Sequence, residues 1–436
     1  MSASVREKVS GAPRQAFGGR ANRVLRLVTA ASSTLRLDRL ERFDLALPGH
    51  LAGVQDEDDF QAADPVVDQA EASVEQIARE FQNPYLEACR LLREAANIEH
   101  ALLVQYLYAG FSLKDRYLAA RGGDRPPVTT MLGVAVQEMW HLDEVNGILI
   151  DLGAEPNMLR QDFPIETGIY PFALSLEPLT LASCAKYVVA EAPASALDPT
   201  LPENAADLPF IAAVLAQFGA QPIVHIGSLY STIIGVVGEL DPTTFPKKPS
   251  WLATLNDIKQ QGVDGHYHYF RSMFEATHPV FGGQNVWTDP TSDIYPSLAL
   301  PHDPSALLGH PDVIQPVNLR QLAMLGNLHY WLVLGLIALG YLRNEVGPQR
   351  SLLSQAESHM VSALFPLGTT LARNGAGLPF DGLGVSIGLS GLDVARVNAL
   401  KAVIDEIGRL ETACADDLPD EYSTGVAIAT RHLLGG

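Results

Sequence analysis

Cysteine is scarce in this chain of 436 residues. The three cysteines, Cys89, Cys184 and Cys414, lie far apart, and none belongs to a Cys-x-x-Cys pair. Neither a disulfide framework nor a cysteine-ligated zinc site is therefore expected. Because structural disulfides mark oxidising compartments, the expected location is a reducing cytoplasm.

Positive charge is also in short supply, with 30 Lys and Arg against 50 Asp and Glu and a net charge of −20. Nucleic acid is thereby disfavoured as a partner, because phosphate binding needs a basic surface. The exception lies in residues 1–40, which hold eight basic residues but only Glu7 and Asp38 as acids. This leader is either an organellar transit peptide or a basic arm on an acidic body.

Long apolar runs are missing as well. The most hydrophobic stretch, Tyr330–Leu342, has 13 residues, whereas a helix needs about 20 to span a bilayer. A buried helix is predicted there, and a membrane is not an expected partner. The sequence also shows no convincing strand pattern, glycine-rich phosphate loop or repeat of fixed period.

Helical patterns fill most of the chain. Apolar residues recur at three- and four-residue intervals over 84–118, which predicts a long amphipathic helix with Pro84 in its first turn after Asn83. A short turn leads to a second, antiparallel helix over 128–152, closed by Gly153. Further helices are expected over 180–191, 208–240 and 264–277, completing an up-and-down bundle, and over 319–343, 354–373 and 392–414 after a long ordered connection.

Two carboxylates interrupt the apolar faces of the first two helices. Glu99 and Glu138 are surrounded at helical spacing by apolar residues, and an isolated buried charge is costly unless it is paired or binds a metal. His141 follows Glu138 by three residues, which puts both on one helix face. Bundle di-iron sites combine this Glu-x-x-His element with a glutamate from the neighbouring helix. The ligand types suit iron, manganese or zinc, although a core histidine without metal would also fit.

These motifs carry a resemblance. The runs IEHALLVQYLY over 98–108 and VQEMWHL over 136–142 resemble the ferritin-like domain of the iminophenyl-pyruvate dimer synthase family. Enzymes of that family couple indole-3-pyruvate imine in violacein and chromopyrrolate biosynthesis. The likeness extends through EAP at 191–193, HIGSLY at 225–230 and GHYHYF at 265–270, and covers roughly residues 84–385.

The resemblance implies a fold and an organisation. The fold class is all-α, a ferritin-like four-helix bundle with an additional C-terminal helical region. The expected division is a basic arm and loop over 1–70, the metal-binding bundle over 71–280 and the C-terminal helices, packed on the bundle, over 281–436.

The resemblance also implies metal ligands. Glu99, Glu138, His141 and His266 are the expected ligands, with Glu191 as a further candidate. Two positions depart from the family pattern, because Ser228 stands where a carboxylate or amide is common and Val263 stands where a glutamate precedes the second histidine. A mononuclear or unsymmetric centre is therefore as compatible with the sequence as a symmetric pair.

Other residues near the second half of the site have two interpretations each. His225 is either a replacement ligand or a histidine at a helix start, and Asp264 is either a ligand or, as favoured, a helix N-cap. Glu275 and His278 form a second Glu-x-x-His, but His278 precedes proline and is driven out of helical geometry. His266 is therefore preferred over His278, and His329 and His359 are read as core or pocket residues.

The predicted function is a metal-dependent oxidoreductase of specialised-metabolite biosynthesis, with iron as its metal. Its substrate would be an amino-acid-derived imine or a related aromatic small molecule, and a homodimer is compatible with the sequence. Two alternatives stay open: a metal-dependent cyclase or other non-redox enzyme on the same scaffold, and a non-catalytic partner-binding protein with a relic metal site.

Overall fold

The computed structural model describes residues 77–122, 129–160, 172–193, 195–218, 226–345, 350–382 and 393–435, apart from the side chains of 226–228. The arm and loop predicted over 1–70 lie outside these ranges. All described residues belong to one compact unit, and they contain helices and two isolated bridges but no β-strand. The all-α prediction is confirmed. The boundary placed between residues 280 and 281 stays a prediction.

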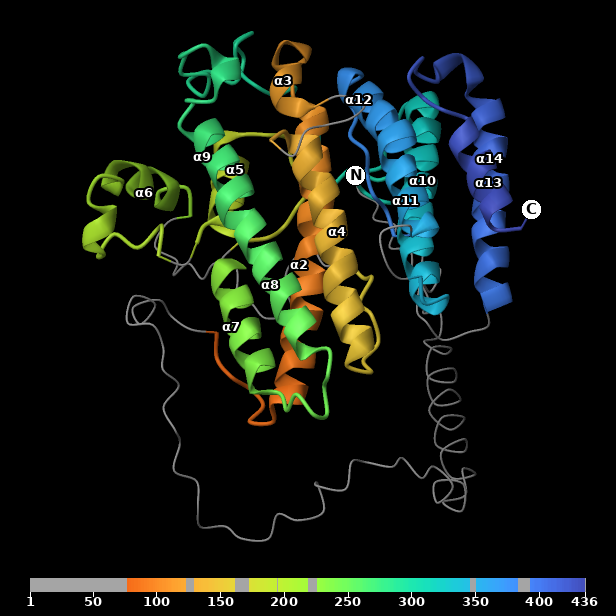
Figure 1. Ribbon diagram of the computed structural model, residues 1–436. Coiled ribbons are helices and arrows are strands. Elements are labelled where there is room, and N and C mark those ends of the chain that lie inside the picture. The colour runs from red at the N-terminus through yellow and green to blue at the C-terminus, as the bar shows by residue number, and fades with distance from the viewer. Residues whose placement is uncertain are drawn as a thin grey trace, which may run out of the picture. The chain divides into compact units, whose positions relative to one another are not determined.

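Four helical elements form the bundle (Figure 1). The first is α2 (Pro84–Ser112) and the second is α4 (Met131–Asp151), with a 3-10 turn (Asp115–Tyr117) and α3 (Leu118–Arg121) between them. The third is divided into α5 (Leu181–Glu191) and α7 (Ile226–Glu239), with a 3-10 turn (Pro202–Asn204) and α6 (Leu208–Leu215) between its halves. The fourth runs through α8 (Lys248–Gln261), a π-helical segment (Gly262–Tyr267) and α9 (His268–Phe274), and a 3-10 turn (Pro279–Phe281) follows it.

Local sequence explains where the bundle helices begin and end. The Asn83 side chain accepts hydrogen bonds from the backbone N–H groups of Tyr85 and Leu86, with Pro84 in the first turn as predicted. Thr130 caps α4 in the same way. Gly153, at φ +82°, follows the end of α4 in the left-handed region that glycine tolerates best. These caps supply partners for backbone groups that a helix end leaves without hydrogen bonds.

The connection between the second and third elements corrects the up-and-down expectation. Asp151, at the end of α4, pairs with Lys247 at the start of α8, and Arg79, just before α2, pairs with Glu239 at the end of α7. The fourth element therefore runs antiparallel to α4, and the third antiparallel to α2. Since α2 and α4 are themselves antiparallel, α4 and α5 run the same way, and the connection from Leu152 to Thr180 returns the chain to the opposite end. One such long crossover is typical of ferritin-like folds.

The fourth element also differs from the prediction. Its helix begins at Lys248 and not at residue 264, because Trp251, Leu255 and Ile258 give a mostly polar segment one narrow buried face. Asp264 is consequently not an N-cap. It lies inside the π-helical segment, is exposed, and accepts a hydrogen bond from the side chain of Gln260.

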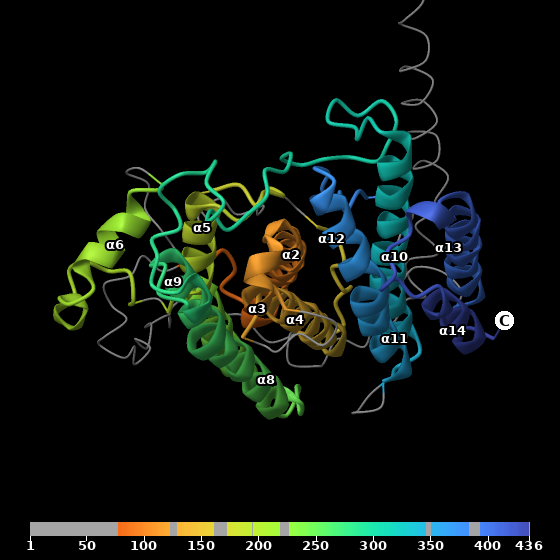
Figure 2. The ribbon, with the colours of Figure 1, turned by 90° about the horizontal axis from the view of Figure 1, so that it is seen from above.

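The C-terminal region adds helices on the side of α2 that faces away from α5. They are α10 (Val317–Leu342), α11 (Ser351–His359), a second π-helical segment (Met360–Leu364), α12 (Phe365–Arg373), α13 (Asp393–Ala413), a 3-10 turn (Ala415–Asp417) and α14 (Gly425–Leu433). Viewed from above, α2 lies between α5 and α12 (Figure 2). A Cβ atom at Gly368 would come within 2.3 Å of the Phe111 ring, so α12 approaches α2 closely. α14 was not predicted.

This packing changes the character of α2. The helix is buried on all sides from Glu94 to Ser112, whereas an amphipathic helix with one solvated face was predicted. The second apolar face is needed because α12 and the C-terminal region cover the side of α2 that the other bundle helices leave open. α2 is therefore the shared core helix of the bundle and the C-terminal region.

α10 is, within the described ranges, the one helix that is long and apolar enough to cross a membrane. Its most apolar 18-residue window has a mean hydropathy of 1.7, yet 89% of that window is buried inside the protein. A core helix passes the same test, so length and composition alone are weak evidence for a span. The apolar stretch is nevertheless longer than the 13 residues from which the buried helix was predicted.

His329 and His359 lie in the core of the C-terminal region. Their Nδ1 atoms are 2.8 Å apart, and the outer nitrogens contact the hydroxyls of Tyr422 and Thr430, each at 2.7 Å. Because burial lowers the pKa of His359 to about 3 and that of His329 well below its usual value, both rings are neutral at pH 7. The hydrogen-bonded chain joins α10, α11 and α14, in agreement with the prediction that the two histidines are core residues.

Candidate metal centre

Five buried side chains from the bundle helices meet in two overlapping groups. Glu99, Glu138 and His141 form one group, and Glu138, Glu191 and His266 form the other. Within each group the nitrogen and oxygen atoms that could bind an ion lie within 4.8 Å of one another. Glu138 belongs to both groups, so a single carboxylate lies at the centre of the cluster.

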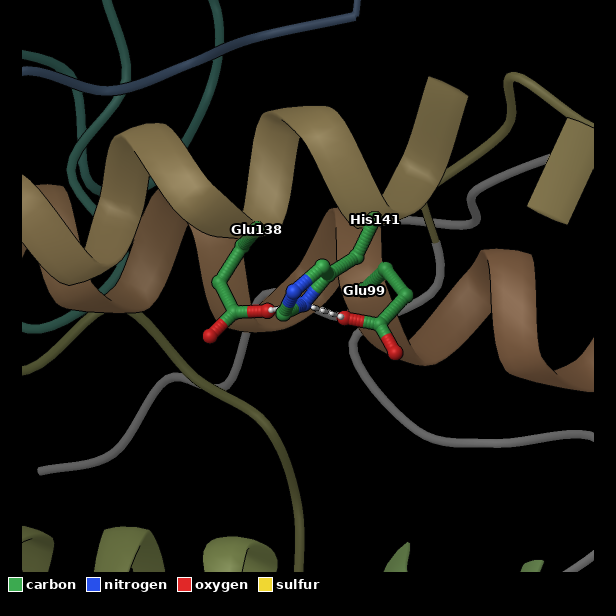
Figure 3. Close-up of side chains that lie close together, drawn as sticks. All are labelled: Glu99, Glu138 and His141. Carbon is green, nitrogen blue, oxygen red and sulfur yellow. Dashed lines mark hydrogen bonds and ion pairs between the residues drawn. The ribbon is translucent and has the colours of Figure 1, made fainter. Parts of the chain in front are cut away.

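The first group joins α2 to α4. The Nδ1 atom of His141 lies 2.8 Å from Oε2 of Glu138 and 3.6 Å from Oε2 of Glu99. Figure 3 shows Glu138 and His141 descending from one face of α4, with the imidazole between the two carboxylates. The three-residue spacing on α4 produces this arrangement, as the sequence predicted.

The second group reaches the third and fourth elements. The Nδ1 atom of His266 lies 3.0 Å from Oε1 of Glu138 and 3.4 Å from Oε2 of Glu191. Glu191 is the last residue of α5, and His266 lies in the π-helical segment between α8 and α9. The two histidines therefore approach opposite oxygens of Glu138, each through Nδ1.

Two tyrosines outside the cluster each bind one of its two outer glutamates, Glu99 and Glu191. Tyr230 donates a hydrogen bond to Oε1 of Glu99, and Tyr106 donates one to Oε1 of Glu191. These four side chains leave one oxygen of each glutamate facing a histidine. The geometry fixes the direction of both outer carboxylates without using the atoms that a metal would need.

Two glutamines contact the Nε2 atoms of the two imidazole rings, on the side away from the carboxylates. The Nε2 atom of His141 lies 3.1 Å from Oε1 of Gln261, and that of His266 lies 2.9 Å from Oε1 of Gln137. An amide oxygen is only an acceptor, so each Nε2 carries a hydrogen whether or not Nδ1, which faces the carboxylates, is also protonated. Neither glutamine was singled out from the sequence. Gln137 precedes Glu138 directly, but Gln261 becomes recognisable only once the fourth helix is placed.

The pKa shifts within the cluster show that, without a bound ion, its buried carboxylates need positive charge nearby. Burial raises the pKa of Glu99 to about 8 and also raises the pKa of Glu191. Burial opposes a charged His266, but the neighbouring Glu138 and Glu191 raise its pKa to about 9. Burial likewise opposes ionisation of Glu138, and the two histidines overcome it and hold its pKa well below the usual range. In the absence of metal, protons therefore supply the positive charge that the carboxylates require.

A metal ion fits these residues on two observations. Glu138 Oε1 and His266 Nδ1 are buried and lie 3.0 Å apart as an ion pair, and neither atom makes a further hydrogen bond among the described residues. A cavity of about 20 Å³, bordered by Glu99, Glu138, His141 and Glu191, lies at the cluster. Carboxylate oxygens and imidazole nitrogens are ligands for iron, manganese or zinc. The donor atoms are thus arranged around space that an ion can use.

The remaining candidates lie elsewhere or outside the described ranges. His225 and the side chain of Ser228 fall outside them. Glu275 pairs with Arg271, and His278 accepts a hydrogen bond from the backbone of Val280 at the 3-10 turn that follows α9. The second Glu-x-x-His of the sequence is therefore no part of this cluster.

Comparison with known proteins supports the fold. Residues 92–279 match the protein family described as ferritin-like, which agrees with the four-element bundle, and the predicted fold class is confirmed. Dichlorochromopyrrolate synthase of Lentzea aerocolonigenes is 33% identical over 127 residues. That match covers 24% of this chain and only 12% of the relative. No solved structure matches. The narrower dimer synthase family stays a prediction.

Two glycines of the π-helical segment provide a matched test of how tightly the cluster is packed. A Cβ atom at Gly262 would lie 3.2 Å from Oε2 of Glu191, whereas one at Gly265 would meet nothing within 4 Å. Gly265→Ala should stabilise the fold by up to about 1 kcal/mol, the usual helical gain. Gly262→Ala should show a smaller gain or a loss, because it displaces Glu191. Urea unfolding of both variants measures the difference, and equal gains would contradict the packing described.

Proposed function

We propose that this protein is a metal-dependent oxidoreductase, with iron as its metal, that acts on an amino-acid-derived imine or a related aromatic intermediate of specialised metabolism. The observation that carries the proposal is the position of Glu138. This one carboxylate lies between two histidines, and each histidine also faces a second glutamate. Such an arrangement suits a pair of ions better than a single one.

The proposed ligands divide into two sets. Glu99 and His141 would hold one ion, Glu191 and His266 would hold the other, and Glu138 would serve both. The pair is unsymmetric, because the second Glu-x-x-His of the standard bundle site is Val263-x-x-His266 in this chain. The sequence left nuclearity open, and the two overlapping groups favour the paired site.

When bound, iron ions supply one-electron chemistry and dioxygen activation at such a site. The chain's own residues do the rest. Tyr106 and Tyr230 orient the outer glutamates, Gln137 and Gln261 hold the rings of the histidines, and burial of all five proposed ligands keeps water away. Orientation of this kind raises metal affinity and keeps the ligand geometry fixed during a reaction.

Two lines support the substrate class. The motifs over 98–108 and 136–142 resemble the dimer synthase family, whose enzymes couple an amino-acid-derived imine. The similar protein from Lentzea aerocolonigenes is a dichlorochromopyrrolate synthase, although this chain spans only a small part of it. Both lines support a biosynthetic enzyme, and from the resemblance we infer that its reaction is oxidative and its substrate an aromatic small molecule.

Metal content tests the site first. Glu138→Ala should lower bound iron from about two equivalents to below about 0.2, because it removes the ligand shared by both sets. Glu275→Ala, which alters the other Glu-x-x-His of the chain, is the matched control and should leave the iron content unchanged. Elemental analysis and circular dichroism of both variants measure metal and folding. A folded Glu138→Ala variant that keeps its iron would refute the assignment.

Proton release offers a second test. His266, with a pKa of about 9, and Glu99, with a pKa of about 8, are both protonated at pH 7 without metal, and both must lose a proton to bind an ion. Metal binding should therefore release about two protons or more at pH 7 and fewer at pH 9, while the apparent affinity rises with pH. Calorimetry with Mn²⁺ in two buffers of different ionisation enthalpy counts these protons. Binding without proton release at pH 7 would contradict the proposed ligands.

The redox assignment is tested by exchanging the metal. With dioxygen supplied as the electron acceptor, protein loaded with iron should couple the imine that an amino-acid oxidase generates from tryptophan, whereas protein loaded with zinc should be inactive, because zinc has no accessible redox change. Product is measured by mass spectrometry. Equal turnover with zinc would favour the cyclase or another non-redox enzyme, and a chain that binds no transition metal would favour the partner-binding alternative.

A further inference from the structure

The two glutamines at the cluster exchange partners between helices. Gln137 lies on α4 together with His141, yet its Oε1 atom contacts Nε2 of His266, on the fourth element, at 2.9 Å. Gln261 lies at the end of α8, on the same element as His266, yet its Oε1 atom contacts Nε2 of His141 at 3.1 Å. Each glutamine therefore binds the histidine of the opposite element.

Helix geometry explains this exchange. Gln137 precedes His141 by four residues, which is about one turn of α-helix. Gln261 precedes His266 by five residues, which is about one turn of π-helix, and the residues between them belong to the π-helical segment. Because α4 and the fourth element are antiparallel, a residue one turn before either histidine lies opposite the other histidine. The extra residue of the π-helical segment thus keeps Gln261 aligned with His141.

The two side chains also contact each other. The amide nitrogen of Gln137 donates a hydrogen bond of 3.4 Å to Oε1 of Gln261. Gln137 thus uses its oxygen for His266 and its nitrogen for Gln261, while the oxygen of Gln261 accepts from both Gln137 and His141. Every donor in this chain faces an acceptor. Both amide oxygens, and not the amide nitrogens, are therefore directed at the rings.

The chemical character of these partners bears on a bound ion. Among the described residues, every carboxylate that pairs with either ring approaches Nδ1. The Nε2 atoms instead donate to neutral amides. A carboxylate at the outer N–H of a ligating histidine makes the ring a stronger donor to its metal, and hydrogen bonds to a charged acceptor are about twice as strong as those to a neutral one. The amides therefore leave both rings weaker donors than carboxylates would.

We propose that Gln137 and Gln261 are positioning residues that raise the reduction potential of the iron pair. They hold each ring so that Nδ1 faces the ion, and they place no negative charge at Nε2. A ring that donates less charge stabilises ferric iron less than ferrous iron, so the oxidised pair is the stronger oxidant. The proposal rests on the metal site of the proposed function and names the residues that set its oxidising strength.

Gln261→Glu provides the sharpest test in the full chain loaded with iron. The substitution keeps an acceptor oxygen for His141 and Gln137 and adds one negative charge, and because residue 261 is exposed, the new carboxylate is ionised at pH 7. The reduction potential should fall by about 59 mV or more, a tenfold change in a one-electron equilibrium. A redox titration followed by absorbance measures this change.

Asn256→Asp is the matched control for added charge. Asn256 is exposed on the same helix, and its side chain donates to the backbone oxygen of Leu252 and not to the cluster. This variant should change the redox equilibrium by less than about threefold, because an exposed charge is screened by water and salt. An equal fall in potential in Asn256→Asp and Gln261→Glu would overturn the proposal.

The exchange of partners gives a second readout, which packing alone would not produce. In zinc-loaded protein with isotope-labelled histidine, a stronger acceptor should move the resonance of the Nε2 proton that it binds. Gln261→Glu should shift the proton of His141 and leave that of His266 in place, and Gln137→Glu should do the reverse. The opposite assignment, or no selective shift, would contradict the proposal. If Gln137→Glu, at a half-buried position, does not fold, Gln261→Glu decides alone.

Iron content, measured before each redox titration, separates this inference from the proposed function. A chain that holds two iron ions and keeps the same potential in Gln261→Glu overturns the role of the glutamines alone. A chain that takes up no metal overturns the proposed function together with this inference.

Discussion

The structure depends above all on a buried carboxylate that faces two imidazoles. Glu138 is 1% exposed, and its two oxygens lie 2.8 Å from His141 and 3.0 Å from His266. An ionised carboxylate at this depth is tolerated only with opposite charge close by. His266 belongs to the fourth bundle element, so this requirement links α4 to the junction between α8 and α9. Glu99 and Glu191 add α2 and α5 to the same cluster.

The lack of symmetry in the cluster arises from the fourth element. Its helix changes from α to π geometry at Gly262 and returns to α geometry at His268. Single turns of π-helix inside α-helices often occur at functional sites. Here the π-helical segment presents His266 to Glu138, while Val263 and Gly262 line the cavity beside it. The first and second elements, by contrast, are uninterrupted helices that present Glu99, Glu138 and His141 at ordinary helical spacing.

The sequence was informative where an apolar pattern surrounds a polar residue. Glu99 and Glu138 stood out because each breaks an apolar helix face, and both are indeed buried at the core. Gln137 and Gln261 could not be found this way, because a glutamine on a polar face looks like any surface residue. The helix from Lys248 was missed since only three of its residues face inward. The long crossover was missed because a helical pattern in the sequence does not show which way the helix runs in the bundle. Only contacts such as that of Asp151 with Lys247 show this direction.

The burial of α2 on all sides has a consequence for how this domain can be used. In a self-sufficient bundle, the outer face of each helix is polar and meets water. Here that face of α2 includes Tyr108 and Phe111, which meet Gly377 and Gly368 of the C-terminal region. A shortened chain that ended after the fourth element would expose this aromatic surface along the helix that carries Glu99. The bundle therefore relies on the C-terminal helices to cover this face, and a larger side chain at Gly368 or Gly377 would push on the helix that carries Glu99.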